Sequence, residues 1–199
     1  GKLVAREERL LHPLPPWPWG EPLAFAEAPF ADPERYRLGP VPVFRLDNAV
    51  ITRRAEASPR ALAAYLLDLG GRWQVSAWVD GLMPGLAGMA TTFTASGGLL
   101  VLGRDPVSMA EAAGAVARMG GGLAWAKEGR VVWSRPLPIW GYRGYMLETP
   151  FSETLEVEEE LWTLAREAGY AHEDILYSLA LPHLRLPAGV QVDPTGGAR

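Results

Sequence analysis

The sequence of 199 residues contains no cysteine and only three histidines. Without cysteine, the chain can form no disulfide, thiolate nucleophile, cysteine-ligated zinc site or cysteine-held iron–sulfur cluster. The three histidines, His12, His172 and His183, are too scattered in the sequence to be recognised as a metal site. These absences exclude several kinds of chemistry, but they do not by themselves indicate what the protein does.

Positive charge and long apolar runs are also scarce. The formal net charge is −4, and Lys2 and Lys127 are the only lysines. The nearest approach to a basic run is Arg53-Arg54, which we interpret as a solvated strand end. This balance predicts neither a nucleic-acid partner nor an anionic membrane surface. No stretch approaches the roughly 20 apolar residues that span a bilayer, and residues 1–6 lack an apolar signal core, so we expect a cytoplasmic protein.

What the chain does contain is apolar and turn-forming residues: it is 48% hydrophobic, with 22 glycines, 18 prolines and eight tryptophans. This composition and length predict one globular domain with an arm. We place an N-terminal hairpin and proline-rich arm at 1–40, the domain at 41–193 and a flexible tail at 194–199. Prolines fix the backbone at 12–20, so we expect an extended arm whose tryptophans pack on the domain, the alternative being a peptide-ligand role.

Alternating and helical patterns predict the elements of the domain. Ser58-Pro59 and Asp105-Pro106 each combine a capping side chain with a proline suited to the first helical turn. We expect helices at 58–69, 105–119, 152–168 and 172–181. We expect strands at 43–46, 50–52, 73–79, 89–94, 99–102, 123–126, 131–133, 184–186 and 190–192, with Gly129 in a hairpin turn. Strands and helices do not alternate strictly, which favours an α+β fold: a mainly antiparallel sheet of about six strands flanked by helices.

Common catalytic motifs are missing or explained by structure. The sequence contains no GxxxxGK[ST] loop, HExxH pair or GxSxG elbow. Gly120-Gly121-Gly122 follows a predicted helix and precedes a predicted strand, the reverse of a phosphate-binding loop, so we interpret it as a helix stop. His183 lies in an apolar run and is interpreted as a core or edge residue. The acidic run at 158–160 is interpreted as the solvated face of a helix.

The strongest signal is a series of short motifs spread along the chain. The segment from 101 to 141 contains VLGRDPVSMA at 101–110, MGGGLAWAKEGRV at 119–131 and PLPIWG at 136–141. Further motifs are DNAVITR at 47–53, LALPHLRL at 179–186 and VQVD at 190–193. Taken in the order of the chain, these motifs resemble the C-terminal domain of microbial adenine deaminases. Residues 1–11 are similar to the hairpin that precedes that domain, and residues 14–16 to the proline-rich connection between them.

The resemblance implies that the metal chemistry of the family lies outside this sequence. Adenine deaminases resemble other amidohydrolases, in which histidine and aspartate ligands of an upstream (β/α)₈ barrel hold the metal that activates water for attack on the purine. Such a barrel needs on the order of 250 residues. We therefore expect no cofactor, no metal ligand and no catalytic residue in this chain.

One motif of the family is altered here. The family carries an AHDSHN stretch just before the strand that corresponds to residues 99–102, whereas residues 91–98 read TTFTASGG and contain neither histidine nor aspartate. A small residue in place of histidine removes both proton transfer and metal ligation. The remaining polar groups are the candidate ligand-binding residues Thr91, Thr92, Thr94 and Ser96, the alternative being that the threonines are ordinary strand residues.

Three hypotheses of function follow. The first is a catalytically incomplete relative that acts as a stand-alone binding or interaction domain. The second is an accessory subunit that completes a purine-deaminating amidohydrolase whose barrel is a separate chain. The third is a small enzyme or binding protein with another site, for which the candidate polar residues are Asp80, Asp105 and Glu128. The tryptophans and the arm also offer apolar surface through which the chain could form a homo-oligomer.

Overall fold

A mixed sheet of eight strands forms the centre of the fold in the computed structural model, which describes residues 3, 5–6, 9–11, 25–27, 29–56, 58–70, 72–94, 97–137 and 151–180. Its strands are β3 (Val43–Leu46), β4 (Thr52–Ala55), β5 (Leu62–Leu67), β6 (Gln74–Asp80), β7 (Gly88–Thr91), β8 (Leu99–Gly103), β9 (Gly122–Lys127) and β10 (Arg130–Pro136). Two short N-terminal strands, β1 (Ala5–Arg6) and β2 (Arg9–Leu10), pair as a separate antiparallel hairpin.

The sheet is mainly antiparallel. Its strands lie in the order β10-β9-β7-β8-β5-β6-β3-β4. Every neighbouring pair runs antiparallel except β3 and β6, which are parallel. The predicted α+β class is therefore confirmed, with eight strands in the sheet where we expected about six.

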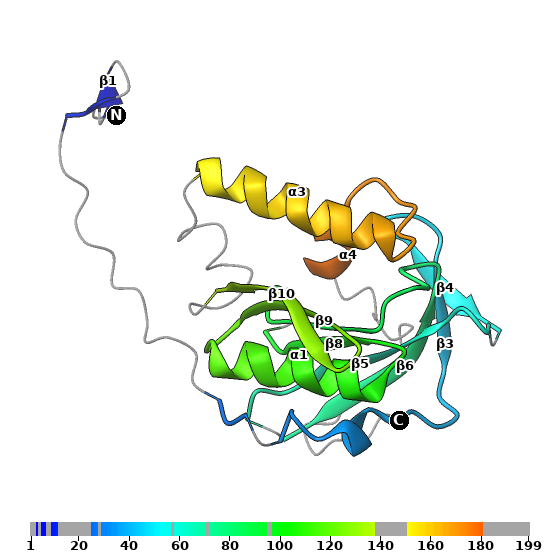
Figure 1. Cartoon of the computed structure of the whole chain (residues 1–199). Coiled ribbons are helices and arrows are strands. Elements are labelled where there is room, and N and C mark those ends of the chain that lie inside the picture. Colours follow the sequence, from blue (N-terminus) through cyan, green and yellow to red (C-terminus); the bar gives the residue numbers. More distant parts are fainter. Residues whose placement is uncertain are drawn as a thin grey trace.

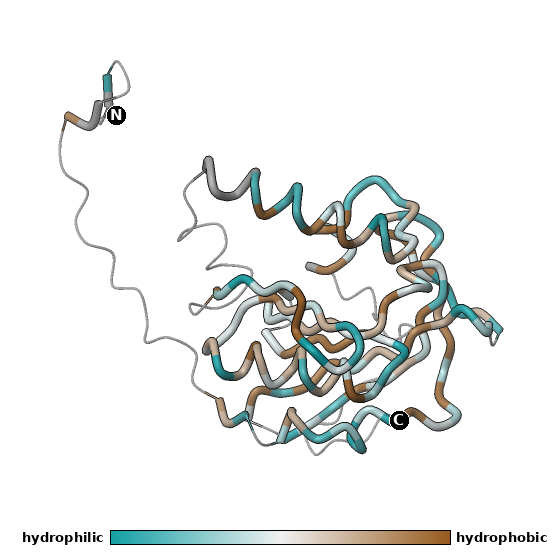
Figure 2. Tube along the Cα trace, in the orientation of Figure 1, coloured by the Kyte–Doolittle hydropathy of each residue, from teal (hydrophilic) through white to brown (hydrophobic). Residues whose placement is uncertain are grey.

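Helices cover both faces of the sheet (Figure 1). Helix α1 (Pro106–Arg118) lies on one face, and α3 (Phe151–Glu167) and α4 (Ile175–Ala180) lie on the other. Helix α3 alternates between polar and apolar positions, and its apolar positions turn towards the sheet (Figure 2). Among the described residues, no helix is both long enough and apolar enough to cross a membrane.

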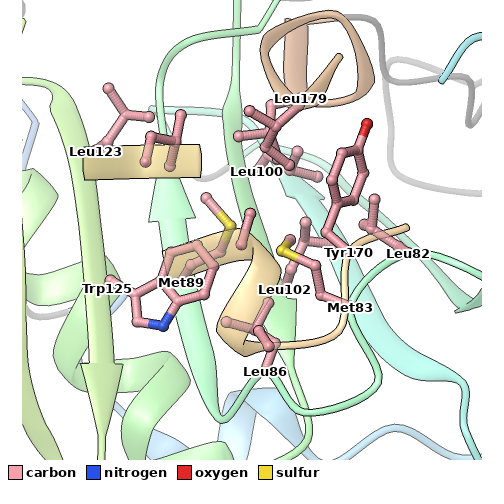
Figure 3. Packing of buried hydrophobic residues seen from close by; sticks show 14 of the residues in the cluster. Leu82, Met83, Leu86, Met89, Leu100, Leu102, Leu123, Trp125, Tyr170 and Leu179 are labelled. Atoms are coloured by element: carbon pink, nitrogen blue, oxygen red, sulfur yellow. The ribbon is translucent and has the colours of Figure 1, made fainter. Parts of the chain in front are cut away.

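Two hydrophobic clusters follow from this layering, one on each face of the sheet. Strand β5 contributes to both, because Leu62 and Ala64 face α3 and α4 whereas Ala63, Tyr65 and Leu67 face α1. On the side of α3 and α4, side chains from the strands, the β6–β7 loop and the helices point towards one another (Figure 3). The labelled members of that cluster are Leu82, Met83, Leu86, Met89, Leu100, Leu102, Leu123, Trp125, Tyr170 and Leu179.

The segment before β3 covers the outer side of α1. The short 3₁₀ helix η1 (Pro33–Tyr36) begins after Asp32, whose side chain accepts a hydrogen bond from the backbone N–H of Glu34. Phe30 and Tyr36 are buried in the cluster on the α1 side, and Glu27 forms an ion pair with Arg118 of α1. The boundary between an arm at 1–40 and a domain at 41–193 stays a prediction.

Several predicted elements are confirmed in detail. Asp105 caps α1 by accepting hydrogen bonds from the backbone N–H groups of Val107 and Ser108, and Met109, Ala113 and Val116 of the helix are fully buried. Strands β9 and β10 form the predicted hairpin. Glu128 and Gly129 at its turn have φ angles of 53° and 69°, as a tight hairpin of this kind requires.

One predicted helix is wrong. Residues 58–69 are expected to be helical because leucines recur at helical spacing, but the structure places strand β5 (Leu62–Leu67) there. Strand β5 lies between β6 and β8 and is buried on both faces, so apolar residues occupy consecutive positions and hide the alternation that marks a strand. Ser58 accepts a hydrogen bond from the backbone N–H of Arg60 in a turn.

The C-terminal half is described only as far as residue 180. Helix α3 forms as predicted, and Gly169, with a φ of 90°, follows its end. Helix α4 is shorter than the predicted 172–181 and begins after Asp174, whose side chain accepts a hydrogen bond from the backbone N–H of Tyr177. The arm at 12–20, the strands at 184–186 and 190–192, His183 and the tail all lie outside the described residues.

Helix α1 approaches β7 closely at Gly88. A Cβ atom on Gly88 would lie 2.4 Å from the backbone nitrogen of Met109 and 2.4 Å from the carbonyl carbon of Ser108. Because both atoms belong to the backbone of α1, no side-chain rotation relieves such a contact. The absence of a side chain at this position therefore sets the distance between the helix and the sheet.

Gly88→Ala is expected to push α1 away from β7 and to lower the free energy of unfolding by about 1–3 kcal/mol, the usual cost of overpacking a core. Urea unfolding followed by tryptophan fluorescence measures the change. Gly39→Ala is the control, because a Cβ there has no atom within 4 Å and should change stability by less than about 0.5 kcal/mol. Equal stability of the two variants would contradict this packing.

Candidate functional site

Three of the four candidate site residues lie together at the end of a central strand. Thr91 is the last residue of β7 and pairs with Leu100 of β8 on one side and Leu123 of β9 on the other. Thr92 and Thr94 follow directly. The exposed fractions of Thr91, Thr92 and Thr94 are 0%, 3% and 4%. The fourth candidate, Ser96, lies outside the described residues.

The hydroxyl groups of these threonines bond to backbone atoms of the same chain. The hydroxyl oxygen of Thr91 accepts a hydrogen bond from the backbone N–H of Phe93 at 2.8 Å. The hydroxyl of Thr94 donates to the carbonyl oxygen of Gly98 at 3.3 Å and so closes the loop between β7 and β8. These bonds give the hydroxyls a role in holding the chain, and ligand binding by them stays a prediction.

Thr92 joins the ends of two neighbouring strands. Its backbone N–H donates to the carbonyl oxygen of Gly122 at 2.9 Å, and its hydroxyl oxygen accepts from the backbone N–H of Gly122, also at 2.9 Å. Next to this pair, the backbone N–H of Leu137 donates to the carbonyl oxygen of Gly121 at 3.0 Å. The ends of β7, β9 and β10 therefore meet at one hydrogen-bonded junction, formed by Thr92, Gly121, Gly122 and Leu137.

The triple glycine is confirmed as a helix stop and has a second role that its sequence did not reveal. Gly121 donates to the carbonyl oxygen of Val116 in the last turn of α1. A Cβ on Gly121 would lie 2.6 Å from the carbonyl oxygen of Leu137 and 3.2 Å from the hydroxyl oxygen of Thr92, and its φ angle is 124°. Glycine is therefore required for the close approach of the backbone to Thr92 as well as for the end of the helix.

Apolar side chains surround the junction on the side of α3 and α4. Phe93, Met89, Leu100 and Leu123 all belong to the cluster on that face. Met89, Leu100 and Leu123 come from three adjacent strands and point into this cluster (Figure 3). Buried threonine hydroxyls in such surroundings need hydrogen-bond partners, and the backbone supplies them.

The other candidate polar residues have local structural roles. Asp105 accepts a 2.6 Å hydrogen bond from the hydroxyl of Ser108, and this bond, with the backbone N–H groups of Ser108 and Val107, lowers the pKa of its carboxyl group despite partial burial. The same hydroxyl oxygen accepts from the backbone N–H of Gly129, so Ser108 links the start of α1 to the turn that contains Glu128. Asp80 instead ends β6, in register with Arg45.

The described histidine, His172, also has a structural partner. Its Nε2 atom lies 2.7 Å from the carbonyl oxygen of Gly81, and its ring meets the edge of the Tyr170 ring. It thereby connects the segment between α3 and α4 to the loop after β6. Within the described ranges, no three histidine, aspartate or glutamate side chains come close enough together to hold a metal ion.

Thr92→Val is expected to lower the free energy of unfolding by about 1–3 kcal/mol, because valine has a similar shape but leaves the buried N–H of Gly122 without its acceptor. Thermal and urea unfolding measure the difference. Thr92→Ser is the matched control, since it keeps the hydroxyl and should lose less stability than the valine variant. A valine variant at least as stable as the serine variant would show that this hydrogen bond contributes little.

Comparison with known proteins gives the family. The model of the family described as adenine deaminase C-terminal domain matches residues 48–196. A protein of Halalkalibacterium halodurans named "Putative adenine deaminase" is 31% identical over 127 residues, which cover 61% of this chain and 21% of that protein. A Bacillus subtilis protein of the same description is 28% identical over 132 residues, or 63% of this chain and 22% of its own.

A third relative, the adenine deaminase of Desulfatibacillum aliphaticivorans, is 38% identical over 89 residues, which cover 45% of this chain and 15% of the relative. The matched region of this chain thus spans about a fifth of the length of these relatives or less. The family match covers most of the chain, including β5 to β10 and both α1 and α3. The chain belongs to the adenine deaminase C-terminal domain family.

Proposed function

We propose that this chain is a catalytically incomplete adenine deaminase domain, which acts by binding a partner and performs no deamination by itself. The carrying observation is the junction at Thr92, which occupies the position where the family's histidine- and aspartate-containing stretch is expected. There, the threonine hydroxyls bond to Phe93, Gly98 and Gly122 of the same chain. These hydroxyls therefore stabilise the backbone at the end of β7, and none of them is a group that could transfer protons in deamination.

The chemistry of hydrolytic deamination supports this proposal. The reaction needs a water activated by a metal and a group that moves protons near neutral pH. Metal ions in such sites are held by histidine, aspartate or glutamate side chains, whereas neutral threonine hydroxyls do not titrate near neutrality. The donor set of Thr91, Thr92 and Thr94 does not fit a resident metal, so no catalytic step is assigned to this chain.

A direct assay tests the proposal. The pure chain, supplied in turn with Zn²⁺, Mn²⁺ and Fe²⁺, is incubated with adenine, and the release of ammonia and hypoxanthine is measured. We expect no turnover above the rate of the metal salts alone, with the full-length Desulfatibacillum enzyme as the positive control. Turnover that follows the purified chain and disappears in a Thr91→Val, Thr92→Val double variant that still folds would refute the proposal.

A second function is favoured by the length of the relatives. Because the chain corresponds to about a fifth of each of the Halalkalibacterium and Bacillus proteins, the remaining four fifths hold whatever else their activity needs. In this alternative, the chain completes a purine-deaminating amidohydrolase whose barrel is supplied by another polypeptide. Its contribution is then to pack against that barrel.

An exposed apolar patch offers a place for such packing. Val50, Ile51 and Tyr177 are each more than 40% exposed. Val50 and Ile51 lie in the β3–β4 turn, which is held by Asn48, and Tyr177 lies on α4. The hydroxyl of Ser178 donates to the carbonyl oxygen of Ala49 at 3.0 Å, so the helix and the turn are in contact. We name Val50, Ile51 and Tyr177 the turn patch.

Reconstitution tests the second function. A relative truncated before the region that matches this chain is mixed with the chain, and co-elution and adenine deamination are measured. Ile51→Lys in the turn patch is expected to weaken the apparent affinity for the truncated relative at least tenfold, because it places a charge in an apolar contact. The loss is measured as reduced co-elution. Val132→Lys, on the exposed strand β10, is the control. Failure of the unmodified chain to co-elute or to restore activity would reject this function.

A further inference from the structure

A pocket of about 310 Å³ lies away from the threonine junction. It is lined by Val43, Ser58, Pro59, Ala61, Trp78 and Arg104. These residues come from the start of β3, the β4–β5 connection, β6 and the residue after β8. Trp78 packs against the cluster on the α1 side of the sheet, whereas Phe93, beside the junction, belongs to the opposite cluster. We name this the Arg104 pocket.

The guanidinium group of Arg104 is held in a fixed position. One terminal nitrogen donates to the carbonyl oxygen of Pro84 at 3.2 Å and the other to that of Pro59 at 3.0 Å. Its backbone N–H donates to the carbonyl oxygens of Leu86 and Ala87. Carbonyl oxygens orient the group but leave its positive charge uncompensated, and no described aspartate or glutamate forms an ion pair with it. Several of its five N–H donors stay available.

The rest of the pocket lining is mostly apolar, and its largest side chain, Trp78, is also held by hydrogen bonds. The indole Nε1–H of Trp78 donates to the carbonyl oxygen of Gly39 at 3.2 Å, and its backbone N–H donates to that of Pro42 at 2.9 Å. The tryptophan thus keeps its polar atoms occupied and offers carbon surface to the pocket. Val43, Pro59 and Ala61 add aliphatic surface, and Ser58 is the other polar residue of the lining.

We propose that the Arg104 pocket binds a small carboxylate that carries a flat apolar ring. A carboxylate matches the planar fork of an arginine with parallel hydrogen bonds, and one guanidinium neutralises one such charge. The ring of the ligand covers the surface of Trp78, Val43 and Pro59. The volume lies at the lower end of the range for small-molecule sites, which suits a single ring. This proposal does not depend on any deaminase role.

Benzoate is the probe, and benzamide is its neutral counterpart of the same shape. Each is titrated into the full ¹⁵N-labelled chain, and the indole N–H signal of Trp78, assigned from Trp78→Phe, is followed by NMR. We expect benzoate to bind with a dissociation constant on the order of 1 mM or tighter, a value ordinary for a ligand of this size. Benzamide should bind at least tenfold more weakly, because it lacks the negative charge that pairs with the guanidinium group of Arg104.

Two variants distinguish binding of benzoate in the pocket from a general attraction of benzoate to positive charges on the surface. Arg104→Gln should weaken benzoate binding at least tenfold. Arg60→Gln removes an exposed charge from the β4–β5 connection, which also contains Ser58 and Pro59, but Arg60 does not line the pocket, so this variant should leave binding unchanged. Melting temperatures check folding, and Arg104→Lys, which keeps the charge without the fork, replaces the glutamine variant if that one unfolds. No shift of the Trp78 signal, equal binding of benzamide, or equal effects at positions 60 and 104 would overturn the proposal.

Discussion

The reciprocal hydrogen bonds between Thr92 and Gly122 are the interaction on which the centre of this domain depends. They join β7 to β9 at the point where α1 has just ended and β10 finishes. Four elements therefore share one small group of backbone contacts, and the glycines at 121 and 122 make the approach possible. Thr92 has a structural role because its hydroxyl oxygen, in place of a backbone carbonyl oxygen, accepts the hydrogen bond from the backbone N–H of Gly122.

Close packing also determines how helices cover each face of the sheet. On one face, Gly88 lets the backbone of α1 lie directly on β7. On the other face, long side chains such as Met83, Met89 and Tyr170 fill the wider space between the strands and helices α3 and α4 (Figure 3). The two layers are thus built differently: α1 meets β7 and β9 mainly through small residues such as Gly88, Ala90 and Ala124, whereas large side chains fill the other layer. Both layers leave Thr91 and Thr92, at the end of β7, buried.

The sequence predicted the elements that have local signals. Asp105-Pro106 identified the start of α1, Gly129 identified the hairpin, and the motifs from 101 to 141 identified the family. Strand β5 was missed because burial on both faces removes the alternation on which strand prediction relies. Propensity and periodicity describe one segment at a time, and the identity of β5 depends on its neighbours β6 and β8.

The site was predictable only in part. The sequence placed Thr91, Thr92 and Thr94 beside one another, but the bond from Gly122 to Thr92 joins residues 30 positions apart. The Arg104 pocket was missed for the same reason, since Arg104 meets Pro59 from a distance of 45 residues along the chain. Tertiary contacts of this kind leave no pattern in a single sequence, whereas caps and turns do.

Native-state hydrogen exchange at the backbone N–H groups of Gly122 and Phe93 tests the central claim most directly. The N–H of Gly122 donates to the hydroxyl of Thr92 in the junction, and the N–H of Phe93 donates to the hydroxyl of the neighbouring Thr91. The account predicts that they exchange only through extensive unfolding, with opening free energies within about 1 kcal/mol of the global value. Exchange at the rate of unstructured peptide, with the sheet around them still protected, would show an open site at the end of β7 and contradict the account.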